Sequence, residues 1–184
     1  MPSTDDAGLA EVPVDSHTIY EGRILNLRVD DVVMPDGTKA VREVVEHTAA
    51  VAVVALLPGD RTLLVRQHRY PVAETLLELP AGLVDEGEDP VQAGARELAE
   101  ETGYAPGLIE PMLSFYSSPG FTDEELHIYL ARDLRPTVAS PDEDEFIEPV
   151  VVDWQEAVDM CLDGRIRDAK TITGLLAVAR ALST

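Results

Sequence analysis

The densest group of chemically active side chains lies in the segment AGLVDEGEDPVQAGARELAEETGY, residues 81–104. Glu97, Glu100 and Glu101 fall within five positions, and Arg96 is the one basic residue of the segment. On a helix that advances about 100° per residue, Glu97 and Glu101 lie about 40° apart, with Glu100 about 60° to the other side. Such carboxylates repel one another, whereas Mg²⁺ binds carboxylates together with substrate phosphates. The spacing alone leaves two interpretations open, a divalent cation site and a solvated acidic face.

The helix that carries these acids is marked at both ends. Asp89 is a good N-cap, Pro90 suits the first helical position, and Gly103 is typical of a helix end. The acids are expected to point away from the core, because a different face can pack on a sheet. That face is formed by Val91, Ala95, Leu98 and Thr102.

The elements that must position this helix form a mixed sheet flanked by helices, an α/β or α+β sandwich. Residues 1–12 are expected to be a disordered tail, and residues 13–47 alternate like a small antiparallel β layer with a turn at 35–37. The main domain is expected over 48–184. Its apolar run AAVAVVALL, from Ala49, is typical of a strand buried on both faces. Further strand patterns cover 62–70, 112–118, 126–134 and 146–154, and Asp153 and Asp168 are expected to cap two more helices.

Composition excludes several classes of partner. With 35 acidic and 14 basic residues, the formal charge is −21, which disfavours nucleic acids and anionic membranes. The single cysteine, Cys161, permits no internal disulfide and indicates a reducing compartment. The N-terminal residues contain no apolar stretch typical of a secretory signal. We therefore expect a cytoplasmic protein.

The acidic segment has a fixed pattern beyond its carboxylates. Five residues separate Gly82 from Glu88, and seven more separate Glu88 from Arg96. The remaining fixed positions are Glu97, Leu98, Glu100, Glu101, Gly103 and Tyr104. This pattern resembles the Nudix box of the Nudix hydrolases. The resemblance implies an αβα sandwich and hydrolysis of a nucleoside diphosphate linked to another moiety, with Mg²⁺ as cofactor and Mn²⁺ as a possible substitute.

The resemblance also implies roles for individual residues of the box. Glu97 and Glu101 would be the main metal ligands, and Glu100 a further ligand, direct or through water, within the catalytic set. The carbonyl oxygen of Ala81 would be an additional ligand. The residues that shape the box would be Gly82, Glu88, Arg96 and Gly103, with Arg96 bracing the carboxylates rather than touching substrate.

The flanks of the box indicate a subgroup. Pro119 stands sixteen residues beyond Gly103. Together with VRQHRYPV, LELPAGLVDEGE and EHTAAVAVV, it resembles the ADP-ribose pyrophosphatases. That resemblance implies hydrolysis of ADP-ribose to AMP and ribose 5-phosphate by a homodimer joined through the N-terminal layer. Two alternatives stay open, another nucleoside diphosphate sugar such as ADP-glucose or GDP-mannose, and a non-catalytic ADP-ribose sensor.

The remaining candidate residues follow from the same resemblance. A carboxylate from the acidic loop SPDEDEFIE would activate the attacking water, with Glu143 preferred over Glu145. Arg69 suits phosphate or ribose, because a guanidinium matches phosphate oxygens, and Glu78 suits a ribose hydroxyl or an outer metal water. The residues expected to reach the adenosine end or to line the pocket are Arg42, Glu43, His47, Gly120 and Phe121. The N-terminal layer offers only Tyr20 for stacking on adenine, which leaves base selectivity open.

Overall fold

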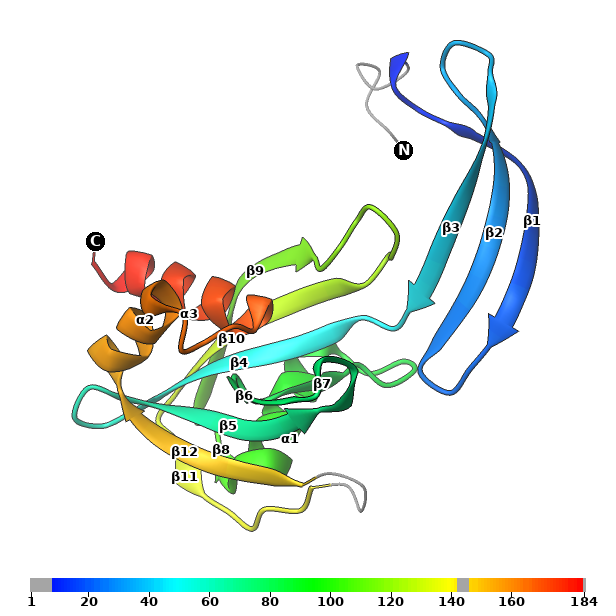
Figure 1. The fold of residues 1–184 in the computed structure, drawn as a ribbon. Coiled ribbons are helices and arrows are strands. Elements are labelled where there is room, and N and C mark those ends of the chain that lie inside the picture. The colour runs from blue at the N-terminus through cyan, green and yellow to red at the C-terminus, as the bar shows by residue number, and fades with distance from the viewer. Residues whose placement is uncertain (1–7, 142–145, 184) are drawn as a thin grey trace. The chain divides into compact units, whose positions relative to one another are not determined.

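The computed structural model describes residues 8–141 and 146–183. The chain divides into two compact units (Figure 1). The first comprises the chain up to Thr48 together with Tyr116–Glu124, and the second comprises Ala49–Phe115 with the residues from Glu125 onward. The segment Tyr116–Glu124 is therefore associated with the N-terminal strands rather than with the strands that flank it in sequence.

The first unit is built on a three-stranded antiparallel sheet in the order β1-β2-β3. These strands are β1 (Val12–Glu21), β2 (Leu25–Val33) and β3 (Lys39–His47). The turn between β2 and β3 contains Gly37 at φ 84°, a left-handed conformation that glycine adopts without steric cost. The predicted tail is described only from Gly8, and its Glu11 pairs with Arg42.

The second unit contains a mixed sheet whose main path runs β12-β5-β4-β10-β9, with β6 on β5 and β7 on β4. Strand β4 (Ala50–Leu57) lies in the middle, antiparallel to β5 and parallel to β10. The other strands are β5 (Arg61–Arg69), β6 (Glu74–Glu78), β7 (Ala81–Leu83), β9 (Leu108–Tyr116), β10 (Glu125–Arg132) and β12 (Ile147–Asp153). A separate pair is formed by β8 (Tyr104–Ala105) and β11 (Arg135–Pro136), and a 3₁₀ turn, Tyr70–Val72, follows β5.

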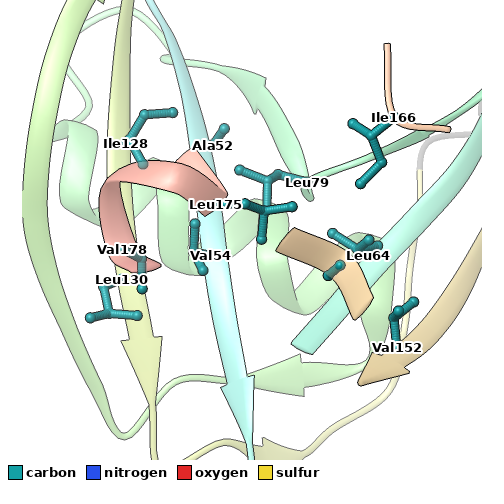
Figure 2. Packing of buried hydrophobic residues seen from close by; sticks show 11 residues of the cluster. Ala52, Val54, Leu64, Leu79, Ile128, Leu130, Val152, Ile166, Leu175 and Val178 are labelled. Atoms are coloured by element: carbon teal, nitrogen blue, oxygen red, sulfur yellow. The ribbon is translucent and has the colours of Figure 1, made fainter. Parts of the chain in front are cut away.

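Helices cover both faces of this sheet. Because side chains alternate along a strand, Val51 and Val53 of β4 face α1 (Pro90–Thr102), in a cluster with Leu98. On the opposite face, Ala52 and Val54 belong to the cluster that packs under α2 (Trp154–Asp163) and α3 (Ala169–Leu182), shown in Figure 2. The expected αβα sandwich with a mixed sheet is confirmed, as is the strand buried on both faces.

The helix boundaries follow the capping residues. Asp89, Asp153 and Asp168 are the N-caps of α1, α2 and α3, and each side chain accepts a backbone N–H of the first turn. Within residues 8–141 and 146–183, none of the helices has the length and apolar character needed to cross a membrane.

Candidate active site

The box acids lie on α1, directly beside the short strand β7. Glu97 and Glu101 are buried, with 9% and 4% of their surfaces exposed, next to Ala93 and Leu98. The expectation that the acids point away from the core is therefore wrong for these two residues. On a helix, Glu97 and Glu101 fall between Ala93 and Leu98 in angle, so the packed arc includes them. Glu100, on the other side, is more exposed.

The backbone of β7 approaches both buried carboxylates. The Ala81 N–H donates to Oε2 of Glu101 at 3.1 Å. A Cβ at Gly82 would lie 2.1 Å from Cδ of Glu97, far inside van der Waals contact, so only glycine leaves room for this carboxylate. The backbone of β7 therefore fixes where the two carboxylates sit.

Arg96 is the cation at the centre of the box. Its guanidinium donates to both carboxylate oxygens of Glu88 at 3.0 and 2.9 Å, to Glu97 at 2.6 Å and to Glu100 at 3.2 Å. It also donates to the Leu83 carbonyl at 3.0 Å. These bonds, led by those to Glu88, raise the pKa of Arg96, and the hydrogen bonds from Arg96 in turn lower the pKa of Glu88. The permanent positive charge of Arg96 thus offsets part of the mutual repulsion of Glu88, Glu97 and Glu100.

The donor set suits a hard divalent cation. Two buried carboxylates, a third partly exposed one and the backbone of β7 offer oxygen donors alone, as Mg²⁺ prefers. Among residues 8–141 and 146–183, no three acidic, histidine or cysteine side chains already converge as ligands. Instead, Arg96 and the Ala81 N–H engage the carboxylate oxygens. The residues that would hold the cation are Glu97, Glu101, Glu100 and the carbonyl of Ala81.

Arg69 and Glu78 form a second charged group in the same unit. Nε and Nη2 of Arg69 donate to the two oxygens of Glu78, both at 2.8 Å, and Glu78 is only 1% exposed. Burial raises the pKa of Glu78, but Arg69 and Lys170 outweigh it and lower that pKa overall. The bonds to Glu78 raise the pKa of Arg69, with a smaller contribution from the charge of Glu101. Because its two oxygens are engaged, Glu78 is better suited to holding Arg69 than to contacting a ribose hydroxyl.

The other candidate residues belong to the first unit or lie outside the described residues. Nδ1 of His47 lies 3.3 Å from the Glu124 carboxylate, and the backbone N–H of His47 donates to the Asp123 side chain at 2.9 Å. Phe121 is 54% exposed and so is no core residue. Arg42, Glu43 and Gly120 also belong to this unit. Glu143 and Glu145 lie outside the described residues.

Sequence reasoning missed Lys170. It donates to both Glu78 and Asp168, and its side chain is 13% exposed. Its contact with Glu78 joins residues 92 positions apart, so no local pattern marks it. The one feature of the sequence that could have indicated Lys170 is the rarity of lysine, because Lys39 and Lys170 are the only lysines in the chain.

Family models account for most of the chain. Residues 46–175 match the NUDIX domain, and residues 13–45 match the nucleoside diphosphate sugar hydrolase N-terminal domain. The chain therefore belongs to the Nudix family, as its box indicates. Members of this family generally require a divalent metal ion.

Individual relatives and a solved structure are similar to this protein over most of the chain. A "Methanol dehydrogenase activator" of Bacillus methanolicus is 40% identical over 88% of this chain and 89% of its own length. An "ADP-ribose pyrophosphatase" of Bacillus subtilis (strain 168) is 38% identical over 89% of each. A crystal structure titled "ADP compounds hydrolase" superposes with a TM-score of 0.86 over 94% of both chains at 24% identity, which supports the fold.

Proposed function

We propose that this protein hydrolyses the diphosphate of ADP-ribose and releases AMP and ribose 5-phosphate. The observation that carries the proposal is the box geometry, in which Glu97 and Glu101 are buried against the backbone of β7. Similarity to an ADP-ribose pyrophosphatase over most of both chains supports the choice of substrate.

The reaction adds one water molecule across the diphosphate. The water oxygen bonds to one phosphorus, the bridging P–O bond breaks, and the bridging oxygen leaves with the other phosphate. A divalent cation, which we propose to be Mg²⁺ with Mn²⁺ as substitute, supplies charge neutralisation on the phosphates and activation of water. Arg69 binds a phosphate or ribose oxygen through its partly exposed guanidinium, while Glu78 holds its orientation. A carboxylate of the acidic loop, Glu143 or Glu145, accepts the proton of the attacking water.

A substrate panel tests this proposal. ADP-ribose, ADP-glucose and GDP-mannose are incubated with Mg²⁺, with Mn²⁺ and with chelator, and mononucleotide release is measured by chromatography. We expect metal-dependent release of AMP, with the highest kcat/KM for ADP-ribose. Preference for another sugar nucleotide would move the assignment to that substrate. Tight ADP-ribose binding without turnover of any compound would establish the sensor alternative.

The assignment of the base has its own test. Glu143→Gln is expected to lower kcat about 100-fold, the usual scale for loss of a general base, and Glu145→Gln less than tenfold. Each variant is assayed at saturating ADP-ribose across a range of pH. The reverse order of effects would assign the base to Glu145.

We also propose that the protein works in the cytoplasm as a homodimer joined through the first unit. Strand β1 is exposed along its length, and it presents Val12, Val14, Ile19 and Tyr20, each about 60% exposed. Exposed apolar patches of this kind mark interfaces.

Val14→Asp is expected to shift the dimer toward monomer in light scattering after size exclusion. Val138→Asp, at another exposed valine, should not. A monomeric wild-type protein would contradict this assembly.

A further inference from the structure

The start of α3 contacts the chain segment that leads into the box. Lys170 donates to Oε2 of Glu78 and, at 3.0 Å, to Oδ1 of Asp168. The oxygen Oδ2 of Asp168 accepts the Thr171 hydroxyl at 2.6 Å and the Thr171 N–H at 2.9 Å. The Thr171 hydroxyl oxygen accepts the backbone N–H of Leu79 at 2.8 Å. One helical turn thereby holds both the side chain of Glu78 and the backbone that follows it.

The contact of Lys170 with Glu78 acts on the position of the Arg69 guanidinium, which Glu78 also binds. Glu78 is almost fully buried, and a buried carboxylate is costly unless cations and hydrogen bonds compensate it. Lys170 and Arg69 provide that compensation from opposite directions in sequence, one from α3 and one from the end of β5. Because Glu78 engages Nε and Nη2, the Nη1 edge of Arg69 makes no hydrogen bond within the described part of the chain. Arg69 is thus fixed on one edge and available to an anion on the other.

The second contact, of Thr171 with Leu79, holds the residues that lead into β7, whose own backbone also pairs with β4. Leu79 is held through its N–H by Thr171, and its side chain packs against α3 beside Leu175 (Figure 2). A Cβ at Gly174 would lie 2.7 Å from Cδ1 of Leu79, so the helix approaches this residue closely. The next residue, Pro80, accepts the Val53 N–H at 2.9 Å, and Ala81 bonds to Glu101. Residues 79–81 thus make hydrogen bonds to α3, to β4 and to the buried Glu101 carboxylate of α1.

We infer that the first turn of α3, residues 168–171, is a positioning element that sets both the Arg69 guanidinium and the β7 backbone beside Glu97 and Glu101. This inference rests on the proposed function and deepens it. Lys170 acts on substrate binding through Glu78 and Arg69. Thr171 acts on cation binding through Leu79 and Ala81. Neither residue is required to touch substrate or metal.

The Lys170 contact predicts a separation of kinetic constants. Lys170→Met removes the charge and keeps a side chain of similar length. The Glu78 carboxylate then loses one of its two cationic partners and holds Arg69 less firmly in place. We expect KM for ADP-ribose to rise about tenfold, with kcat within about threefold of wild type and Mn²⁺ affinity unchanged. Lys170→Arg, which keeps a donor to Glu78, should recover much of the loss. The matched control is Arg167→Met, which removes an exposed ion pair with Glu74 near the same turn and should change neither constant.

The Thr171 contact predicts a change in metal binding. Thr171→Val removes the hydroxyl that accepts from Leu79 and keeps the side-chain volume, whereas Thr171→Ser keeps the hydroxyl. Because residues that orient metal ligands typically affect affinity by about 10–100-fold, we expect Thr171→Val to weaken Mn²⁺ binding about tenfold in calorimetric titration. Thr171→Ser should bind Mn²⁺ as the wild type does.

Specific results overturn the inference. A Lys170→Met variant with a lowered melting temperature but wild-type KM would show that the contact only stabilises the fold. A folded Thr171→Val variant with wild-type Mn²⁺ affinity would remove the link to the box. If Thr171→Val does not fold, the KM of Lys170→Met decides. If the wild-type protein turns over no sugar nucleotide, the proposed function fails, while the Mn²⁺ titrations still test the positioning of the carboxylates.

Discussion

Glu97→Gln is expected to lower kcat for ADP-ribose about 10³-fold, the scale seen when charge stabilisation of a transition state is lost. The substitution preserves size and one acceptor oxygen, but it replaces the other oxygen with a donor NH2 group and removes the negative charge from a buried position against Gly82. Glu101→Gln should have a similar effect, although its amide oxygen can still accept the Ala81 N–H. Single-turnover kinetics at saturating Mg²⁺, with Mn²⁺ affinity measured in parallel, check both expectations.

A matched control is available within the same segment. Glu86 is an exposed acid of the loop before α1, so Glu86→Gln removes the same charge without touching the buried carboxylates. It should leave kcat and Mn²⁺ affinity at their wild-type values. Wild-type kcat in either Glu97→Gln or Glu101→Gln would mean that the ligand set is misassigned.

Gly82→Ala is expected to lower kcat about 100-fold, within the range that small displacements of reacting groups produce. The added methyl would fall 2.1 Å from both Cδ and Oε1 of Glu97, so the carboxylate must leave its place beside β7. Because the Glu97 side chain is flexible, we expect the fold to survive and Mn²⁺ affinity to fall together with kcat.

Thermal unfolding separates this displacement from a general loss of structure. A Gly82→Ala protein that melts near the wild-type temperature but binds Mn²⁺ weakly would support the role of Glu97. A variant that keeps wild-type rate and affinity would show that the carboxylate functions equally well in another rotamer.

Local signals in the sequence correctly predicted the helix and the central strand that position the site. The cap residues Asp89 and Gly103 bound α1 as expected, and the apolar run after Ala49 is the central strand. These features depend on residues close together in the chain, so periodicity and capping chemistry reveal them. The box pattern likewise identified the family.

The burial of Glu97 and Glu101 could not be predicted in the same way. Helical periodicity assigns polar residues to the solvent side, yet these two lie in the packed arc of α1. The bare backbone of Gly82 and the Arg96 guanidinium accommodate Glu97, and the Ala81 N–H donates to Glu101. The pairing of Glu78 with Arg69 and Lys170 depends on contacts between distant segments. Such compensation of charge is visible only once the chain is folded.

The place of Arg96 has a consequence for how the protein responds to its metal supply. The positive charge of Arg96 offsets part of the negative charge of Glu88, Glu97 and Glu100 without any divalent ion, so we expect the acidic helix to fold without one. We therefore expect folding not to depend on metal binding, unlike in small domains that fold only around their ion. The protein depleted of metal by chelator should then keep its wild-type circular dichroism spectrum and regain activity when the ion is added back, without refolding.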